Sequence, residues 1–230
     1  KLPMPPLEMQ SQISEELDNY QKIIDGCRQV ITNYKPMFET NSNWENLKLK
    51  DLAKLNYGLN EGALDKGKYR YIRITDINEQ GYLKDTNKKY INISKKEQKY
   101  ILKNEDILIA RTGATYGKCL YFENKEPSVY ASYLIKIKLD ESKILPKYFW
   151  IFTQSELFNQ QKLKLVTGTG QPQFNANTLE EVIVPIPSID EQKKIIKNVK
   201  EQQNLIFGNT LLIKEFEKKI SEKILTIFSS

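Results

Sequence analysis

Apolar side chains recur every three or four positions at both ends of the chain, which is the period of an α-helix with one buried stripe. At each end the spacing alternates strictly between four and three. Such an alternation is a heptad seam, and it predicts helices that pack against a coiled-coil partner. The first seam is Ile13, Leu17, Tyr20, Ile24, Cys27, Ile31 and Tyr34, and the second is Ile195, Val199, Gln202, Ile206, Asn209, Ile213, Phe216 and Ile220.

The two helical ends are also copies of one another. The segment LPMPPLEMQ at residues 2–10 matches VPIPSIDEQ at residues 184–192, and the same offset aligns the two seams without a gap. Each copy predicts a proline-rich extended lead-in and then a helix, because the residue before a proline avoids the helical region. Ser188 or Asp190 can cap the second helix. Gly26 and Gly208 fall at the same level and predict a close helix approach or a kink there, since a mid-helix glycine costs about 1 kcal/mol relative to alanine.

We expect the two helices to pair with each other in antiparallel orientation. They flank the same central segment, and their net charges oppose, at −2 for residues 1–40 and +2 for residues 183–230. An antiparallel pair also lets a single domain return the chain to its start. The alternative is that each helix packs on its own domain. The residues expected to pair are Ile13, Leu17, Tyr20, Ile24, Ile31, Ile195, Val199, Ile206, Ile213 and Phe216.

The central segment reads as mixed α and β. Strands are predicted where apolar and polar residues alternate between turn residues, and a helix where Pro146 occupies a first-turn position. The predicted strands cover 69–75, 106–111, 119–122, 130–139 and 181–184, the helix covers 147–165, and glycine-bearing loops cover 112–118 and 167–175. The predicted fold class is α+β: a mixed α/β domain at 41–183, flanked by helices at 1–40 and 184–230 that form an antiparallel coiled coil.

Composition excludes several classes of function. The chain has no histidine, which removes histidine-based catalysis and histidine-ligated metals. Its two cysteines cannot form a disulfide framework or a four-thiolate zinc site. No apolar run is long enough to span a membrane and no signal core is found, so a cytosolic compartment is the simplest interpretation. With no cofactor-binding motif either, we expect neither enzyme activity nor a bound cofactor.

The charge distribution favours a polyanionic partner. The chain carries +6, and residues 41–182 hold all of that excess because the ends cancel. A basic central domain is typical of a nucleic-acid-binding protein, and a lysine-rich solvated surface is the alternative. Arginine can read guanine, amides can read adenine and lysine can hold phosphate. The candidate DNA-binding residues are Arg70, Arg73, Arg111, Thr112, Tyr116, Lys118, Thr169, Gln171, Gln173 and Asn175.

Four segments, in this order, resemble the specificity subunits of type I restriction–modification systems. The lead-ins at 2–10 and 184–192 are similar to those before the family's conserved helices, and DILIARTGATYGK at 106–118 and GTGQPQFN at 168–175 resemble its target-recognition domain. The resemblance implies a non-catalytic subunit whose recognition domains each read half of a bipartite site in double-stranded DNA. It implies paired helices that set the half-site spacing and bind methyltransferase subunits, which carry the S-adenosylmethionine chemistry. A separate motor-nuclease subunit completes the restriction enzyme.

The sequence departs from the family pattern in having one recognition domain between two conserved helices, where the family has two domains. We therefore expect either the second half of a longer subunit or a natural half-length subunit. A half-length chain can restore two-part reading by forming a two-fold homodimer, which would read an inverted repeat.

Two alternative functions keep part of this description. A coiled-coil interaction scaffold would use the helices without reading DNA, and the basic excess of the central segment argues against it. A specificity module of a fused restriction–methylation enzyme would make the same DNA contacts with a different partner, and only genomic context separates it from the type I subunit.

Overall fold

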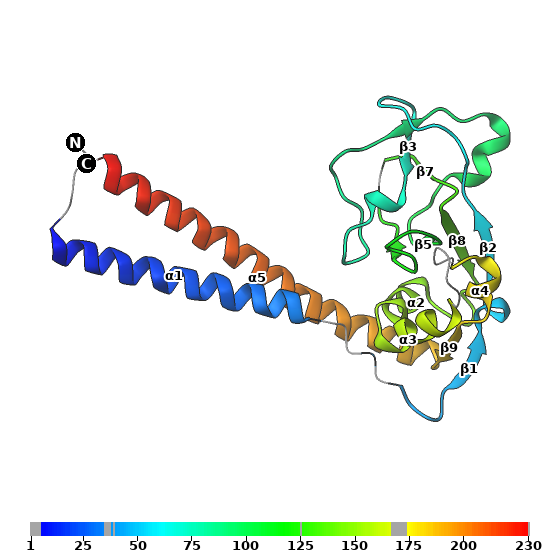
Figure 1. Ribbon diagram of the computed structural model, residues 1–230. Helices are drawn as coiled ribbons and strands as arrows, with labels where there is room; N and C mark the ends of the chain where they lie inside the picture. The colour runs from blue at the N-terminus through cyan, green and yellow to red at the C-terminus, as the bar shows by residue number, and fades with distance from the viewer. Residues whose placement is uncertain (1–5, 35–37, 39, 125, 167–173, 230) are drawn as a thin grey trace. The chain divides into compact units, whose positions relative to one another are not determined.

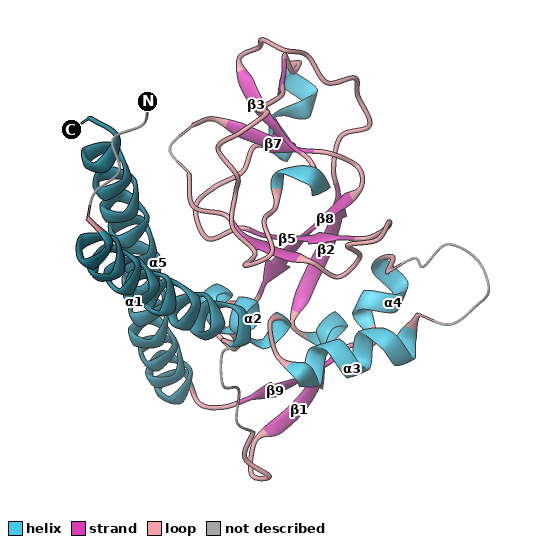
Figure 2. Cartoon of the chain, turned by 60° about the vertical axis from the view of Figure 1, so that its left-hand side comes forward, coloured by secondary structure: helices cyan, strands magenta, loops and turns pink. Residues whose placement is uncertain are grey.

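The computed structural model describes residues 6–34, 38, 40–124, 126–166 and 174–229, with side chains to residue 226. The chain divides into two compact units: a helical unit of Lys1–Pro36 with Asn198–Ser230, and a globular unit of Met37–Lys197. The described part of the helical unit is almost entirely helix, whereas strands, loops and short helices mix in the globular unit (Figure 2). Among the described residues, no helix has an apolar stretch long enough to cross a membrane.

The helical unit pairs α1 (Leu7–Asn33) with the C-terminal part of α5 (Ile189–Ser229), as Figure 1 shows. Three contacts across the pair are the Tyr20 and Phe216 rings at 5.3 Å between centroids, the hydrogen bond from Tyr34 Oη to Gln202 Oε1 at 3.2 Å, and the ion pair of Lys223 Nζ with Glu16 Oε2 at 2.6 Å. Residue numbers therefore rise along α1 as they fall along α5. The predicted antiparallel pairing is confirmed.

The predicted seam follows the more buried side of the two helices. Ile24 is 1% exposed and Val199 is also buried. The other predicted pairing residues are partly buried: Ile13, Leu17, Tyr20, Ile31, Ile195, Ile206, Ile213 and Phe216. Ile195 lies in the part of α5 that belongs to the globular unit. The polar seam residues are satisfied, since Gln202 accepts from Tyr34 and Asn209 Nδ2 donates to the Leu205 carbonyl at 2.9 Å.

The two matched glycines do not mark a close approach of the helices. A Cβ atom built on Gly26 or Gly208 would meet nothing within 4 Å. Each glycine lies inside a helix that continues through it. The expectation of close packing at this level is therefore wrong, because both residues face open space.

The described strands of the globular unit form three small sheets. The four-stranded antiparallel sheet has the order β2 (Ala53–Tyr57), β8 (Leu134–Leu139), β5 (Ile107–Ala110), β6 (Cys119–Tyr121). A second sheet has the order β4 (Tyr90–Ile91), β3 (Tyr69–Ile72), β7 (Ser128–Tyr130), with β3 and β7 parallel. A third pairs β1 (Glu45–Lys48) with β9 (Ile183–Ile186) in antiparallel register. In both views the four-stranded sheet lies between the other two (Figures 1 and 2).

Apart from the beginning of α5, the described helices of the globular unit are short. They are α2 (Pro146–Thr153), α3 (Glu156–Leu165) and α4 (Ala176–Glu180), with 3-10 turns at Leu49–Asp51, Ile74–Asp76 and Lys95–Tyr100. Strand β5 is buried along its whole length, which explains its continuous apolar run. Helix α2 is buried from Tyr148 to Thr153 and is tied to β9 by the hydrogen bond from Tyr148 Oη to the Pro185 carbonyl at 2.6 Å.

Several predicted elements are interrupted for local reasons. The helix expected over 147–165 is two helices, because Ser155 Oγ accepts from Phe158 N–H and begins a new one. The strand expected over 69–75 ends at Ile72, since the Asp76 carboxylate accepts from the Arg73 N–H and turns the chain into a 3-10 helix. The strand expected over 130–139 is divided between β7 and β8. Strands β1, β2 and β4 were not predicted.

The beginning of α5 is fixed to the globular unit by one glutamine. Ser188 Oγ accepts from Glu191 N–H at 3.3 Å, which confirms one of the two predicted caps. One turn on, the fully buried Gln192 side chain accepts from Leu145 N–H at 2.8 Å and donates to the Lys143 and Pro187 carbonyls at 2.8 and 3.0 Å. The amide therefore satisfies three backbone groups at once.

Replacing Gln192 with leucine is expected to destabilise the globular unit by about 2–4 kcal/mol. The side-chain volume is nearly kept, but one buried and two partly buried backbone groups lose their partner, and an unsatisfied group costs up to about 1–3 kcal/mol, without full additivity. Urea unfolding followed by tryptophan fluorescence measures the change, since Trp44 and Trp150 both lie in the globular unit. The partly exposed Gln203 of α5 is the matched control, and Gln203→Leu should shift the midpoint little. Equal midpoints for the two variants would contradict this role.

Candidate nucleic-acid interface

The turn between β5 and β6 is a polar loop of the globular unit that its own backbone hydrogen bonds close. We call residues 111–118 the recognition turn. It is closed at its base, where Ala110 N–H donates to the Lys118 carbonyl at 2.9 Å and Gly117 N–H donates to the Ala110 carbonyl at 2.7 Å. Gly113 and Gly117 have φ angles of +81° and +77°, which side chains other than glycine rarely adopt. The predicted strand–turn–strand is therefore present and tightly held.

Arg111 begins this turn and is held by aromatic rings. Its guanidinium carbon lies 5.1 Å from the centre of the Tyr57 ring and 5.8 Å from that of Tyr133. The two tyrosines are 42% and 55% exposed, so the rings stand at the surface. Its backbone is also anchored, because the Arg111 N–H donates to the Tyr133 carbonyl and its carbonyl accepts from Phe174 N–H. The guanidinium thus has a defined position at the surface.

Arg111 differs electrostatically from the other arginines. The sequence has four, and three of them pair with carboxylates: Arg28 with Glu217, Arg70 with Asp85 and Glu126, and Arg73 with Asp76. Arg111 forms no ion pair with the residues that the structure describes, and its buried Nε has no hydrogen-bond acceptor among them. Among the described residues, the faces of two tyrosine rings are what its charge meets.

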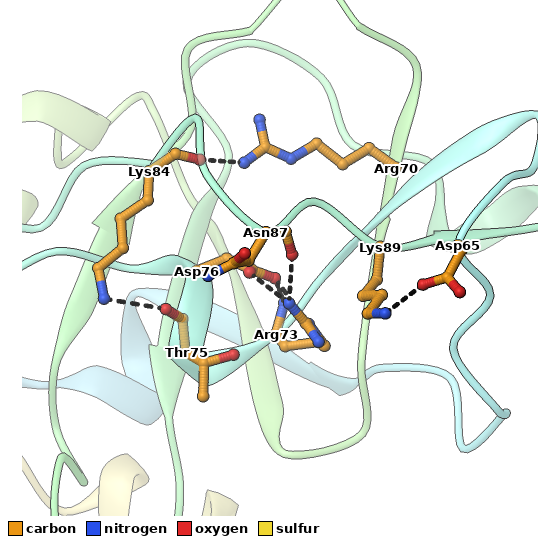
Figure 3. Close-up of polar contacts among 8 residues, drawn as sticks. All are labelled: Asp65, Arg70, Arg73, Thr75, Asp76, Lys84, Asn87 and Lys89. Carbon is orange, nitrogen blue, oxygen red and sulfur yellow. Dashed lines mark hydrogen bonds and ion pairs between the residues drawn. The ribbon is translucent and has the colours of Figure 1, made fainter.

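Arg70 has a different place from the one predicted. Its side chain is 2% exposed, and one of its nitrogens donates to the Lys84 carbonyl (Figure 3). The other terminal nitrogen lies 3.8 Å from Asp85 and 4.0 Å from Glu126. The expectation that Arg70 projects toward nucleic acid needs correction, because this side chain lies in the interior and supports the backbone of a neighbouring segment.

Arg73 also serves the fold of that segment. It binds the buried Asp76 carboxylate through Nε at 3.0 Å and Nη2 at 2.8 Å, and Nη2 donates to the Asn87 carbonyl at 3.0 Å (Figure 3). The Asp76 hydrogen bond raises the pKa of Arg73, so its charge is already neutralised locally. In the same close-up Lys84 Nζ donates to the Thr75 carbonyl, and Lys89 binds Asp65. The basic side chains of this region therefore stabilise the fold of residues 73–89 by binding its carbonyl groups and nearby carboxylates.

The remaining candidates of the recognition turn are partly buried. Lys118 Nζ lies 2.7 Å from Glu79 Oε1, and this hydrogen bond lowers the pKa of Glu79. Thr112 and Tyr116 are each partly buried. The ammonium of Lys162, a residue of α3, lies 5.2 Å from the centre of the Tyr116 ring. Lys118 is thus partly neutralised, whereas Tyr116 stands beside a second cation.

The second predicted loop is described only at its end. Thr169, Gln171 and Gln173 lie outside the described residues. Asn175 caps α4, because its Oδ1 accepts from Thr178 N–H at 3.0 Å and from Thr178 Oγ1 at 3.2 Å. Its carbonyl oxygen is therefore engaged in the fold, and a two-bond reading of adenine by this amide would require the cap to open.

Tyr57, Tyr133 and Lys162 belong to the site, and the sequence did not reveal them. Tyr57 ends β2 and Tyr133 precedes β8, and both read as ordinary strand aromatics. Lys162 is one of several lysines on a polar helix. In the antiparallel β2–β8 register Tyr57 is opposite Ile135, so Tyr57 and Tyr133 lie at the same end of the strand pair, beside Arg111.

Comparison with known proteins agrees with this architecture. The model of the type I restriction modification DNA specificity domain matches residues 41–222. The specificity subunit of type I restriction enzyme MjaVIII from Methanocaldococcus jannaschii is 25% identical over 97% of this chain and 59% of its own length. That of StySPI from Salmonella potsdam is 23% identical over 73% of this chain and 36% of its own length. The chain thus spans well under two thirds of the curated relatives it matches.

Solved structures share the fold at low sequence identity. A chain in a structure on complex assembly and conformational transition of the type I R-M system has a TM-score of 0.62 and 13% identity, covering 99% of this chain and 60% of that one. The HsdS subunit from Thermoanaerobacter tengcongensis has a TM-score of 0.57 and 12% identity over 99% of this chain and 60% of its own. The S subunit from M. genitalium has a TM-score of 0.58 and 15% identity, over 96% and 59%. By the family match over most of its length, this chain belongs to the type I restriction modification DNA specificity domain family.

Proposed function

We propose that the chain is a non-catalytic DNA-recognition subunit, or part of one, of a type I restriction–modification system. The globular unit reads one half of a bipartite site in double-stranded DNA, and the helices dock methyltransferase subunits. The observation that carries the proposal is the guanidinium of Arg111 at the recognition turn, which forms no ion pair with the described residues and lies beside two exposed tyrosine rings. S-adenosylmethionine belongs to the methyltransferase partner, and the motor-nuclease subunit joins through the assembled complex.

The chemistry of Arg111 suits recognition of a base. A guanidinium presents donors in a planar fork, and that fork matches the O6 and N7 acceptors of guanine in the major groove. The tyrosines and the anchored backbone limit the side-chain entropy that would be lost on binding.

The surface of the helical unit supports docking of a protein partner. Apolar side chains stand exposed outside the seam of this pair, and exposed apolar surface is typical of interaction sites. They are Met9, Val30, Leu205, Phe207, Leu211 and Leu225. Methyltransferase subunits are the partners expected here, with a second copy of this chain as a further partner if the subunit is half-length and reads an inverted repeat.

Selection from a random DNA library tests the proposal. Duplexes retained by the purified chain are sequenced after binding at about 50 mM and about 200 mM salt, because phosphate attraction alone fades steeply over that range. We expect a short enriched motif that contains guanine at both salt concentrations. A paired inverted motif at fixed spacing would add that the chain reads DNA as a dimer.

Retention without a motif, lost at the higher salt, would contradict direct reading by this chain alone. The selection is then repeated with a methyltransferase subunit bound to the helices. Failure to enrich a motif in that complex would leave the interaction scaffold as the better description.

A further inference from the structure

We propose that Lys162 of α3 is a phosphate-binding residue beside the recognition turn. This inference rests on the proposed function, and it adds a DNA contact at a position that no sequence motif singled out. Three observations carry it: the contact of the Lys162 side chain with the turn, the absence of an ion pair with the described residues, and the proximity of its ammonium to Tyr116.

The Lys162 side chain lies directly against the recognition turn. A Cβ atom built on Gly117 would come within 2.3 Å of Lys162 Cδ, so the glycine makes room for the lysine stem. The backbone of Gly117 is fixed by its bond to the Ala110 carbonyl, and the ammonium lies 5.2 Å from the centre of the Tyr116 ring. The turn and the lysine therefore form one packed surface, with the cation held near the aromatic side chain.

Lys162 forms no ion pair in the described part of the chain, whereas Lys48, Lys118 and Lys136 of the same unit each bind a carboxylate. Burial lowers the pKa of Lys162, because its ammonium has lost water, and the attraction of the Glu156 carboxylate offsets only part of that effect. An ammonium in this state gains more from an incoming anion than a lysine that is already paired.

Phosphate is the anion that fits this position. Lysine acts as a compact point charge toward phosphate, while the planar fork of arginine is suited to base edges. Phosphate contacts fix the register of a protein on the duplex, and base contacts give specificity. Arg111 is the first residue of the recognition turn, and Lys162 packs against Gly117 near its other end. One side chain can therefore read a base while the other binds a phosphate of the adjacent DNA backbone.

The test compares three variants of the full chain on the duplex selected above and on a scrambled duplex. Lys162→Met keeps the apolar stem against Gly117 and removes the charge. Lys162→Arg keeps the charge, and Lys164→Met removes an exposed lysine two residues along the same helix. We expect Lys162→Met to weaken binding about 5- to 10-fold at about 0.1 M salt on both duplexes, with the slope of log K against log salt smaller by about 0.9. Lys162→Arg and Lys164→Met should stay within about twofold of the parent chain.

The outcome separates this inference from the proposed function. If the parent chain selects a motif but Lys162→Met binds with the affinity and salt slope of Lys164→Met, Lys162 only packs on the turn and the phosphate role is wrong. If neither the parent chain nor its complex with a methyltransferase subunit selects a motif, the proposed function itself fails. A lower affinity with an unchanged salt slope, or a lowered tryptophan-monitored unfolding midpoint in Lys162→Met alone, would show a structural role and would also overturn the inference.

Discussion

Replacing Arg111 with alanine is expected to weaken binding to the selected half-site by about tenfold to a hundredfold. A bidentate contact to a base is worth about 1–3 kcal/mol of discrimination, and the aromatic pair leaves this guanidinium ready to make it. The loss should be confined to the guanine that the side chain reads. Fluorescence anisotropy with the selected duplex, and with duplexes changed at each guanine in turn, measures both effects.

Two further variants sharpen that experiment. Arg111→Lys keeps the charge but not the planar fork, so it should lose most of the discrimination while retaining attraction to phosphate. Tyr133→Leu keeps Arg111 but removes one of the rings, and its loss should be smaller than that of Arg111→Ala. If Arg111→Ala binds the selected and scrambled duplexes with the affinities of the parent chain, Arg111 does not contact DNA.

Placing a carboxylate at Ile24 is expected to separate the helix pair. Ile24 is 1% exposed on the seam, and an uncompensated buried charge costs about 3–5 kcal/mol. A two-helix pair has little other buried surface with which to offset that cost. Circular dichroism of Ile24→Asp should therefore show a loss of helix, while the tryptophan-monitored transition of the globular unit stays in place because both tryptophans lie there.

The neighbouring isoleucine provides the matched control. Ile23 is 40% exposed, so Ile23→Asp introduces the same charge on the same helix at a position that water reaches. We expect its helix content and melting curve to remain close to those of the parent chain. Equal behaviour of the two variants, whether both are stable or both melted, would contradict the assignment of the seam.

The helical unit could be predicted from sequence because its signal is local and repeated. A heptad spacing fixes which face is buried, and the duplicated lead-in identified two equivalent helices. The expectation that the helices approach closely at Gly26 and Gly208 was wrong. A glycine that makes room for a neighbour and one that faces open space look the same in a sequence. In the globular unit the recognition turn was predictable from its glycines. Short strands such as β4 were not, because their pairing depends on contacts distant in sequence.

The candidate site could be predicted only in part, because sequence shows charges but not their partners. Arg70, Arg73 and Arg111 look alike in the chain, yet the first two bind carboxylates and Arg111 forms no ion pair with any residue that the structure describes. The partners Asp85 and Asp76 lie close in sequence to the arginines that they neutralise. However, the carboxylate that meets a given arginine is decided by the path of the backbone. Lys162 was missed for the converse reason, since its environment comes from a turn more than forty residues earlier.

The hydrogen bonds that stabilise residues 73–89 affect which substitutions this domain can accept. Besides their carboxylate contacts, Arg70 and Arg73 each donate to a backbone carbonyl of this segment, that of Lys84 and that of Asn87 (Figure 3). Every amino acid carries a backbone carbonyl, so the anchoring does not depend on the side chain at such a position. Exchanging the side chain of residue 84 should therefore leave these anchoring bonds in place. A surface segment built in this way can accumulate substitutions while its scaffold stays constant, which is the property required when related proteins must come to discriminate different ligands.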